Sequence, residues 1–346
     1  MQSNERSEFV ETFLERYKDI TMKAMRPFML SKEPKRYLYD IVPSYPESGG
    51  KGIRPALCVA TCLAFGGTLQ NILRSAVAIE LFHNAFLIHD DVEDGSEYRR
   101  GEMTMHAKHG IGIAVNVGDA MNVLGIRPLM ENLMILGPKL TWQVFSEIEH
   151  MVTQSVEGQA MELGWVHDNV CDLNEDDYLR MILKKTCWYT CIHPCRIGAL
   201  VGSGGSLNLD CFNRFGYYMG AAFQIQDDIL NLIGDLKKYG KEIGGDIWEG
   251  KRTMMLIHLL NNCTKDEKES IKSFLSKPRN DRSFADIEWI YSLMGKYHSI
   301  EFARSIANQL AGAALTEFFV AYGDRPDSDY KQFIHEIILY MIERDL

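Results

Sequence analysis

The chain has 346 residues, of which 46% are hydrophobic and 24% charged, enough for a substantial buried core. Its net charge is −10, from 47 acidic and 37 basic residues, which argues against general nucleic-acid binding. Eight cysteines without paired spacing, no N-terminal signal core and no apolar run long enough to cross a membrane predict a cytoplasmic protein without disulfides.

Most of the chain is predicted to be helical, because apolar residues recur three and four positions apart and alternating strand patterns are scarce. The predicted helices cover residues 7–30 with a break near Pro27, 54–65, 71–94, 112–135, 140–163, 175–201, 208–234, and several shorter stretches within 251–346. Loops are predicted over residues 43–50 and 234–250, where glycine or proline recurs. No linker or low-complexity tract interrupts this pattern, so the sequence predicts an all-α protein with a single domain over residues 1–346.

A glycine-rich segment precedes the second predicted helix. Gly50 and Gly52 flank Lys51, and Arg54 follows in the first turn of the helix with Pro55. Backbone N–H groups and the helix dipole favour anions at such a place, so Lys51 and Arg54 are candidate phosphate ligands. Taken alone, the segment is weak evidence, because basic residues usually lie on solvated faces.

The helix over 71–94 ends in an acidic cluster formed by Asp90, Asp91, Glu93 and Asp94. Asp90 and Asp94 are one turn apart and project from one face, where like charges repel unless a cation lies between them. Carboxylate oxygens at this spacing suit Mg²⁺. The alternative is a solvated helix end without a function.

A second acidic pair, Asp227 and Asp228, follows another apolar helical run, and Asn231 stands four residues after Asp227. A solvated helix end does not explain both clusters. Two such helices facing each other would form a magnesium cage above an apolar well.

Several basic residues accompany the two acidic clusters. Arg99 and Arg100 follow the first cluster, and adjacent arginines can hold phosphate oxygens bidentately. Lys185, Lys241 and Lys251 add further cations. The joint pattern predicts two anionic groups, one held through Mg²⁺ and one held directly, and two diphosphates fit that description.

Two Glu-x-x-His motifs offer a different metal site. Glu80 and His83 form one, Glu147 and His150 the other, and a pair of such motifs in a helical protein is typical of ferritin-like di-iron proteins. This interpretation leaves both aspartate clusters and the arginine pair without a role. His83 also lies two turns before Asp90, so it is either a structural residue or a donor to a phosphate.

Cys187, Cys191, His193 and Cys195 resemble a zinc-binding set. The three cysteines follow one helical stripe, however, and Pro194 lies within it. A stripe buried in the core is therefore the favoured interpretation.

At these residues the sequence resembles the trans-isoprenyl diphosphate synthases, the family of farnesyl and geranylgeranyl diphosphate synthases. The matching motifs extend from Gly49 to Thr253, more than half of the chain. The resemblance implies an all-α bundle around a deep central cavity, a homodimer, and about three Mg²⁺ ions per active site. It also implies isopentenyl diphosphate and an allylic diphosphate as substrates, joined head to tail into a short-chain all-trans prenyl diphosphate.

The resemblance assigns the metal ligands first. Asp90, Asp91 and Asp94 match the first aspartate-rich motif, which binds Mg²⁺ and the allylic diphosphate. Asp227 and Asp228 match the second motif, which holds the third ion.

The remaining assignments concern the two diphosphates and the developing cation. Arg99 matches the arginine of the allylic diphosphate, and Arg100 its neighbour on the isopentenyl side. The residues matching the isopentenyl diphosphate cradle are Lys51, Arg54 and His83. Those matching the residues beside the cation are Lys185, Thr186 and Gln224, and those matching the lysines that close over the allylic diphosphate are Lys241 and Lys251.

The sequence departs from the family pattern at three positions. Asn231 stands where many members have a third aspartate, and its amide oxygen can still bind a metal. Gly52 replaces a common arginine after Lys51, and Met103 replaces a proline. None of these changes removes a group that the chemistry requires.

Product length is expected to depend on the residues one turn below Asp90. In the family, bulky side chains at the positions of Ala85 and Phe86 limit the depth of the well, and one helical turn is about 5.4 Å, close to one isoprene unit. A small Ala85 with a large Phe86 predicts geranylgeranyl diphosphate (C20), with farnesyl diphosphate (C15) next.

Two other functions remain open on the same fold. A terpene cyclase would use the aspartates and magnesium but has no need of an isopentenyl cradle. A non-catalytic partner subunit of a hetero-oligomeric synthase would be expected to lose aspartates, and this chain keeps both pairs.

Overall fold

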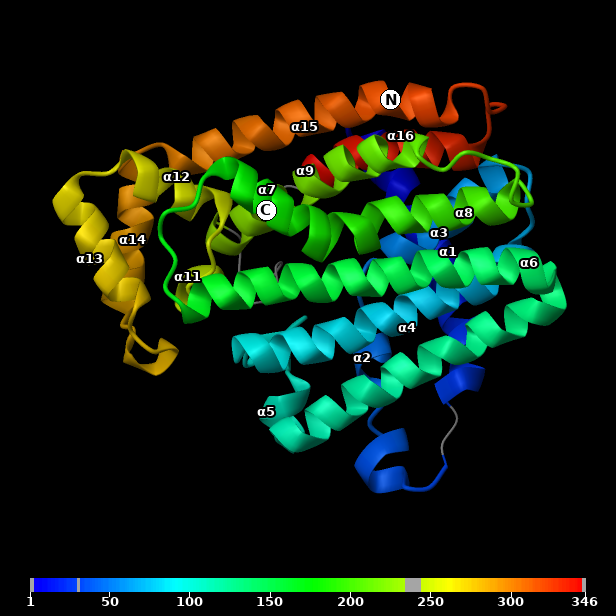
Figure 1. Cartoon of the computed structure of the whole chain (residues 1–346), viewed down its shortest axis with the longest axis horizontal. Helices are drawn as coiled ribbons and strands as arrows, with labels where there is room; N and C mark the ends of the chain where they lie inside the picture. The colour runs from blue at the N-terminus through cyan, green and yellow to red at the C-terminus, as the bar shows by residue number, and fades with distance from the viewer. Residues whose placement is uncertain (1–2, 30–31, 234–243, 344–346) are drawn as a thin grey trace.

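The computed structural model describes residues 3–29, 32–233 and 244–343. Its elements are almost all helices packed side by side (Figure 1). The first half contains α1 (Ser3–Met25), η1 (Arg26–Met29), η2 (Lys35–Tyr39), α2 (Ser44–Glu47), α3 (Ile53–Ala64), α4 (Leu69–Asp94), β1 (Tyr98–Arg99), β2 (Glu102–Met103), α5 (Met105–His109) and α6 (Ile111–His167). The second half contains α7 (Glu175–Ile182), η3 (Leu183–Ile192), α8 (His193–Gly202), α9 (Cys211–Ile233), α11 (Gly245–Glu249), α12 (Met254–Asn262), α13 (Lys265–Leu275), η4 (Arg279–Asp281), α14 (Phe284–Lys296), α15 (Ser299–Tyr322) and α16 (Asp329–Ile342).

The all-α prediction is confirmed, and the predicted helices correspond to observed ones with shifted ends. The first helix leaves the α conformation after Met25, next to the expected break at Pro27. Helix α4 begins two residues earlier than expected, because the Thr68 hydroxyl accepts a hydrogen bond from the Asn71 N–H at 3.3 Å. It ends after Asp94, where Gly95 adopts φ 65°.

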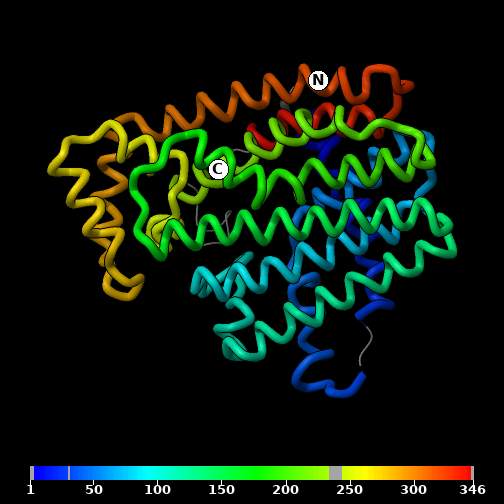
Figure 2. Tube along the Cα trace, viewed as in Figure 1, coloured from blue at the N-terminus to red at the C-terminus, as the bar shows by residue number. Residues whose placement is uncertain are grey.

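Helix α6 reverses direction at Gly137, whose φ of 74° and ψ of 168° are not helical. Pro138 follows it, so the chain forms two arms, residues 111–136 and 138–167, as the sequence predicts. Both arms contact α4, and the second returns along η3 and α8 (Figure 2). The second arm approaches η3 closely, since a Cβ on Gly158 would meet the Lys185 backbone nitrogen at 2.2 Å.

The segment over 175–201 is predicted as one helix but contains three. Between α7 and α8 lies the π-helical segment η3, which carries Lys185, Thr186 and Tyr189. The amphipathic pattern does not distinguish a π-helix from an α-helix, so the sequence misses this change. Wide turns of this kind occur often at functional sites.

The arginine pair lies in a hairpin that the sequence analysis assigns to no strand. Strands β1 and β2 pair antiparallel, with Arg99 opposite Glu102. The two residues between them, Arg100 and Gly101, have φ of 56° and 77°, as a type I′ turn requires. The turn sends the two arginine side chains to different partners.

The predicted loop over residues 234–250 is correct only in part. Residues 234–243, which include the predicted site residue Lys241, lie outside the described residues. Residues 245–249 form the short helix α11. A hydrogen bond links its start to α9, since the Asn231 carbonyl accepts from the Gly244 N–H at 2.8 Å.

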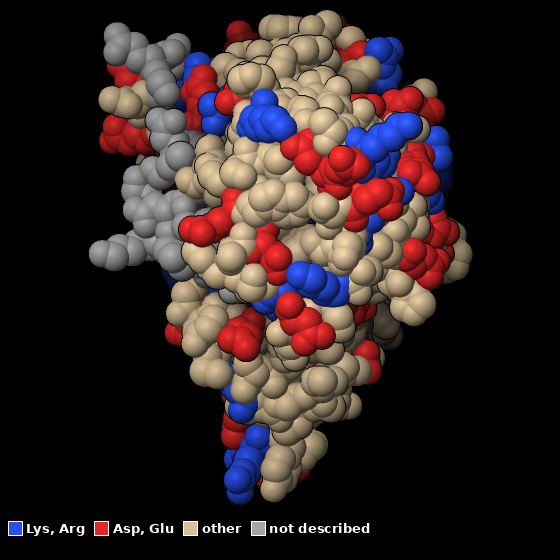
Figure 3. All heavy atoms as spheres, turned by 90° about the vertical axis from the view of Figure 1, so that its left-hand side faces the viewer, with Lys and Arg blue, Asp and Glu red and all other residues tan. Residues whose placement is uncertain are grey.

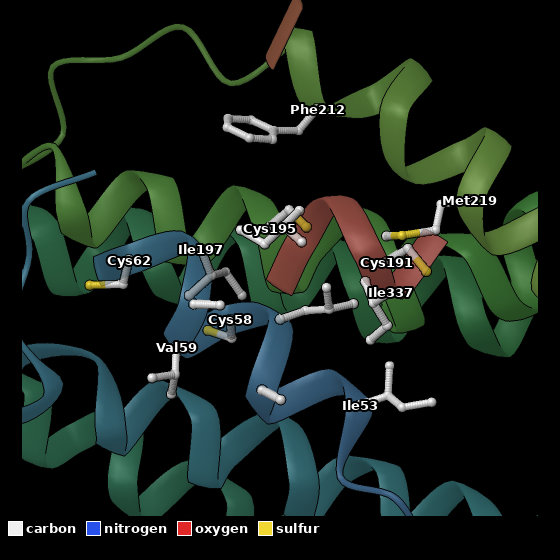
Figure 4. Close-up of a cluster of buried hydrophobic side chains, with 14 of the residues drawn as sticks. Ile53, Cys58, Val59, Cys62, Cys191, Cys195, Ile197, Phe212, Met219 and Ile337 are labelled. Atoms are coloured by element: carbon white, nitrogen blue, oxygen red, sulfur yellow. The ribbon is translucent and has the colours of Figure 1, made fainter. Parts of the chain in front are cut away.

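The cysteine stripe is buried, as predicted. Cys191 and Cys195 lie between α3, α9 and α16 among apolar side chains, close to Cys58 and Cys62 of α3 (Figure 4). All eight cysteines of the chain are free thiols, and six of them are buried.

In the described ranges, no helix is both long and apolar enough to cross a bilayer. The face that looks left in Figure 1 shows acidic and basic side chains interspersed among other residues (Figure 3).

Candidate active site

A cavity of about 590 Å³ lies between α4, the second arm of α6, η3 and α9. Charged residues from both predicted acidic clusters line one part of it, and Phe86, Val152 and Tyr189 line another. The predicted site residues in the lining are Arg54, His83, Phe86, Asp90, Arg99, Arg100, Lys185, Thr186, Gln224, Asp227, Asp228 and Lys251. Segments distant in sequence are thus brought to one place, with charges beside an apolar well.

Asp90 is at the centre of the charged part. Its carboxylate accepts from Arg99 at 3.1 Å, from Lys185 at 3.2 Å and from Gln159 at 3.4 Å. Asp94, one turn on, lies outside the cavity lining and accepts a hydrogen bond from Lys251 at 2.6 Å. Burial raises the pKa of Asp94 to about 7, and Asp90 and Glu249 add to this while Lys251 opposes it.

Asp91 is fully buried and lies outside the cavity lining. It accepts hydrogen bonds from the Tyr45 hydroxyl and, at 2.6 Å, from the Arg99 guanidinium. The Tyr45 oxygen in turn accepts from the Met105 N–H at 3.2 Å. Asp91 therefore anchors Arg99 beside Asp90 in this structure, and its predicted role as a metal ligand stays a prediction.

The second acidic cluster, Asp227 and Asp228, lies wholly in the cavity lining. Asp228 accepts from the Tyr178 hydroxyl at 2.7 Å and from Gln224 at 2.8 Å. Burial raises the pKa of Asp228 to about 8, with Asp246 adding to it and these two hydrogen bonds opposing it.

Asn231 is buried and lies outside the lining. Its Oδ1 accepts from the Asp246 N–H at 3.0 Å and so fixes the first turn of α11 to α9. Its amide oxygen is already engaged with the backbone, and its predicted metal role stays a prediction.

Lys251 lies between the end of the first acidic cluster and two acids of α11. Its Nζ lies 2.6 Å from Asp94, 2.8 Å from Glu249 and 3.9 Å from Asp246. Burial lowers the pKa of Lys251, but these acids outweigh burial and hold it well above its usual value. The lysine is therefore charged in the folded protein.

Lys185 lies on η3 and binds Glu162 as well as Asp90. Burial opposes its charge, but the two carboxylates raise its pKa above the usual range. Its neighbour Thr186 donates to Gln224 Oε1 at 2.8 Å. Since Gln224 donates to Asp228, one chain of hydrogen bonds runs from η3 to the second acidic cluster.

The predicted isopentenyl cradle is brought together in part. Arg54 donates to His83 Nε2 at 3.2 Å and to Thr190 Oγ1 at 2.8 Å. Burial and then the charge of Arg54 lower the pKa of His83 well below its usual value, so the imidazole is neutral. Lys51 lies outside the lining and donates to the Tyr340 hydroxyl at 3.1 Å.

Arg100, like Arg54, lines the cavity, and its guanidinium binds the glycine-rich segment. Its guanidinium donates to the Gly49 carbonyl, to Ser48 Oγ at 3.3 Å and to the Tyr45 carbonyl at 3.4 Å. A Cβ on Gly50 would lie 2.7 Å from this guanidinium, so a side chain there would displace it.

Only one of the two predicted chain-length residues faces the cavity. Phe86 lines it and meets Tyr189 edge to face, with ring centroids 5.8 Å apart. Ala85 is fully buried among the apolar residues of α4, η1, α5 and the first arm of α6, outside the lining. The two residues point in different directions because adjacent helical positions are about 100° apart.

The two Glu-x-x-His motifs belong to separate networks. Glu147 binds His193 and Arg196, with its Oε2 2.8 Å from His193 Nδ1 and 2.7 Å from Arg196 Nε. His83 is bound to Arg54. Across residues 3–29, 32–233 and 244–343, no three His, Cys, Asp or Glu side chains converge as they stand, and the two Glu-x-x-His motifs do not meet in one site.

Replacing Glu147 with glutamine is expected to lower stability in a pH-dependent way. Burial raises the pKa of Glu147, but hydrogen bonds from Arg196 and His193 outweigh burial and hold it at about 2, against 4.5 normally. The folded-state pKa is depressed, so the stabilisation is complete above about pH 4.5 and is lost as the pH falls towards 2. Its size is about 3 kcal/mol.

Urea unfolding of the wild type and Glu147→Gln at several pH values measures this effect. The difference should be largest near neutral pH and shrink in acid. Glu149→Gln, at a neighbouring exposed carboxylate, should change little. A difference that does not vary with pH would contradict the ionic origin of the stabilisation.

Five residues of the site were given no role by the sequence analysis. Gln159 bridges Asp90 and Glu93, Glu162 binds Lys185, and Glu249 binds Lys251. Tyr45 and Tyr178 each hold one aspartate. Only Gln159 and Glu162 could have been found from the sequence, because they are polar residues on the largely apolar cavity-facing side of their helix.

The donor set fits Mg²⁺ by its chemistry. The acids supply hard oxygen ligands, and burial raises the pKa values of Asp94 and Asp228, which a cation bound beside them would lower. Asp90, Asp94, Asp227 and Asp228 would hold the ion or ions. A bound ion would share Asp90 and Asp94 with the lysine and arginine partners that these acids now have.

A sequence model that describes polyprenyl synthetases matches residues 35–294, about three quarters of the chain. The chain belongs to the polyprenyl synthetase family. It is 32% identical over 269 residues to geranylgeranyl diphosphate synthase of Saccharolobus solfataricus, which covers 78% of this chain and 79% of that protein.

Solved structures agree with this assignment. The geranylgeranyl pyrophosphate synthetase of Pyrococcus horikoshii superposes with a TM-score of 0.85 at 28% identity, over 98% of this chain and 99% of that one. A Caulobacter crescentus polyprenyl synthase, crystallised with calcium and isoprenyl diphosphate, superposes with a TM-score of 0.84 over 98% of each chain. Its 23% identity supports the fold alone. This polyprenyl synthetase is a trans-prenyltransferase with the all-α isoprenoid synthase fold.

Proposed function

We propose that the enzyme condenses isopentenyl diphosphate with an allylic diphosphate in a Mg²⁺-dependent head-to-tail reaction. One observation carries this proposal: the charged residues of both acidic clusters and an apolar well line the same cavity. A diphosphate with a hydrocarbon tail has the same division into a charged and an apolar part.

Two groups of residues account for two diphosphates. The allylic diphosphate would lie at Asp90, Asp94, Asp227 and Asp228 through about three Mg²⁺ ions, with Arg99, Lys185, Lys241 and Lys251 contributing charge. Isopentenyl diphosphate would lie against Lys51, Arg54, His83 and Arg100. Arg54 and His83 support the second site, because Arg54 Nε and His83 Nδ1 are buried and find no partner among the described protein atoms.

His83 can serve as a donor to a phosphate without carrying a charge. Arg54 donates to its Nε2, so the ring proton lies on Nδ1. Its low pKa keeps this tautomer neutral. Arg54 supplies the positive charge, and His83 supplies an oriented hydrogen bond.

Bound Mg²⁺ would act as a Lewis acid on the leaving diphosphate. Arg99 and Lys185, which Asp91 and Glu162 fix beside Asp90, neutralise the negative charge that develops there. The allylic C–O bond breaks, leaving a carbocation and diphosphate. The double bond of isopentenyl diphosphate forms the new C–C bond, and loss of a proton to the released diphosphate restores a double bond.

The apolar walls exclude water from the carbocation. Thr186 donates its hydroxyl proton to Gln224, so its oxygen lone pairs and dipole stay directed into the lining beside Lys185. Thr186 and Gln224 thereby position negative partial charge where the cation forms.

Geranylgeranyl diphosphate is the proposed product, with farnesyl diphosphate next. The large ring of Phe86 supports this, since it lines the well one turn from Asp90. The relative from Saccharolobus solfataricus named for geranylgeranyl diphosphate supports the same length.

Replacing Phe86 with alanine is expected to lengthen the main product by at least one isoprene unit. The change removes the ring that packs on Tyr189 and opens space about one helical turn deeper. Mass spectrometry of the dephosphorylated products measures the length. Phe284→Ala, at an exposed phenylalanine far along the chain, is the control. An unchanged length would show that Phe86 is not the floor.

A terpene cyclase on the same fold is the second candidate. It would ionise the allylic diphosphate and close a ring without isopentenyl diphosphate. The paired Arg54 and His83, with Arg100 on the same side of the lining, favour elongation because a cyclase has no use for a second diphosphate site. A non-catalytic subunit is disfavoured, since both aspartate pairs are retained.

We propose a homodimer formed through the first arm of α6. Its exposed large apolar side chains are Ile111, Val115, Val123, Ile126, Met130, Leu133 and Met134. The exposed Asp119 and Arg127 lie four residues to either side of Val123. A second copy packed antiparallel across Val123 would place Asp119 opposite Arg127 twice.

The chain is proposed to act as one domain over residues 1–346 in the cytoplasm. Motif residues from Arg54 to Lys251 line one cavity, which supports one domain. The free thiols support a reducing compartment.

Incubation with Mg²⁺, labelled isopentenyl diphosphate and separate C5, C10 and C15 allylic primers tests the function. A longer linear alcohol after phosphate removal supports the synthase. A cyclic hydrocarbon from the C15 primer alone would establish the cyclase instead. No product with any primer would contradict both.

A further inference from the structure

Tyr45 of α2 contacts the hairpin that carries the two arginines, although it lies outside the cavity lining. Its ring is buried in the apolar core beside α4, α5 and the first arm of α6. Its hydroxyl binds Asp91, which holds Arg99, whereas its backbone carbonyl accepts from Arg100 at 3.4 Å. One buried residue thus holds both arginines, each through a different group.

The Tyr45 hydroxyl is a donor to Asp91. A backbone N–H can only donate, so the hydroxyl oxygen accepts from the Met105 N–H at 3.2 Å, and its own proton goes to the carboxylate. Oδ2 of Asp91 takes this proton, and Oδ1 accepts from Arg99 Nε at 2.6 Å. Because one carboxylate oxygen is held by Tyr45, the other stays directed at Arg99.

The same hydroxyl joins the two sides of the arginine hairpin. Asp91 belongs to the last turn of α4, which ends at Asp94, and Met105 is the first residue of α5. The hairpin lies between these two helices. The hydroxyl therefore fixes the segments from which the hairpin leaves and to which it returns.

Arg100 depends on Tyr45 only through the backbone. Its guanidinium donates to the carbonyls of Tyr45 and Gly49 and to Ser48 Oγ. Replacing Tyr45 with phenylalanine leaves all three acceptors in place. Removal of the hydroxyl should therefore disturb Arg99 and spare Arg100.

We propose that Tyr45 is a positioning residue for the allylic diphosphate, whose hydroxyl acts through Asp91 and Arg99. This rests on the proposed function, in which Arg99 neutralises charge on the departing diphosphate. Arg99 lines the cavity and lies 3.1 Å from Asp90, and the five N–H donors of a guanidinium suffice for both carboxylates and a phosphate oxygen. Without the hydroxyl, the buried Asp91 loses a donor, and its carboxylate and Arg99 are free to reorient.

The decisive variant is Tyr45→Phe, which removes the hydroxyl and keeps the ring in the core. It is expected to lower kcat/KM for the allylic diphosphate about tenfold, while the KM for isopentenyl diphosphate stays within about twofold of the wild-type value. Steady-state rates measure both values, with full-length protein, Mg²⁺ and each substrate varied in turn. A general loosening of the site would raise both KM values instead.

A double-mutant cycle tests whether the hydroxyl acts through Arg99. Arg99→Gln alone should also weaken the use of the allylic diphosphate and spare the KM for isopentenyl diphosphate. Adding Tyr45→Phe to Arg99→Gln should then cost little more, because the arginine that the hydroxyl positions is already absent. Full additivity of the two losses would overturn the inference.

Tyr322→Phe is the matched control. Tyr322 is fully buried, its hydroxyl lies 2.9 Å from Thr61 Oγ1, and it lies outside the cavity lining. It should leave both KM values unchanged. An unchanged allylic kcat/KM in Tyr45→Phe, or an equal rise in both KM values, would also overturn the inference. Absence of elongation in the wild type would instead overturn the proposed function.

Discussion

Replacing Asp90 with asparagine is expected to reduce kcat by about 10³-fold. Asparagine keeps the size of the side chain but removes the charge that meets Arg99 and Lys185. It also removes one hard oxygen ligand, so the Mg²⁺ concentration for half-maximal rate should rise. Steady-state rates of isopentenyl diphosphate incorporation at several Mg²⁺ concentrations measure both effects.

The control for this variant is Asp327→Asn, at an exposed carboxylate just before α16. Asp327 pairs with Lys331 at 3.3 Å, and both residues lie outside the cavity lining. It should retain the wild-type rate and Mg²⁺ requirement. If Asp90→Asn instead stays within a few-fold of the wild type, Asp90 does not hold the metal.

Replacing Lys251 with methionine is expected to lower the free energy of unfolding by about 3–5 kcal/mol without Mg²⁺. Methionine fills similar space, but Asp94 and Glu249 would lose the cation that lies 2.6 and 2.8 Å from them. Because these carboxylates are buried, water does not replace the lost charge. Urea unfolding monitored by circular dichroism measures the loss.

Two comparisons separate this effect from simple repacking. Adding Glu249→Gln to Lys251→Met should recover part of the stability, since it removes one of the unpaired acids. Lys108→Met, at an exposed lysine 2.7 Å from Glu102, should cost less than about 1 kcal/mol. A loss from Lys251→Met as small as that from Lys108→Met would contradict the proposed electrostatic role.

The sequence predicts how the acids of the charged part are spaced along their helices, because helical spacing determines which of them share a face. Asp90 is in the cavity lining, whereas Asp91 and also Asp94, which the pattern places on the same face as Asp90, are not. A run of adjacent acids does not reveal that difference. It depends on Tyr45, which comes from a distant segment and takes Asp91 as its partner.

Other features depend on packing that a single sequence does not encode locally. The π-helical turns that present Lys185 and Thr186 have the same apolar pattern as an α-helix. Lys51 matches the family motif, yet it contacts Tyr340 near the other end of the chain.

The reactivity of the buried cysteines can be used to measure local opening of the core. Cys58, Cys191 and Cys195 have no solvent exposure in the folded state, and burial raises the pKa of each thiol. An alkylating reagent reaches such sulfur atoms only when α3, α8 or η3 separates from its neighbours. The alkylation rate of each cysteine, read by peptide mass mapping under native conditions, therefore measures how often that helix interface opens.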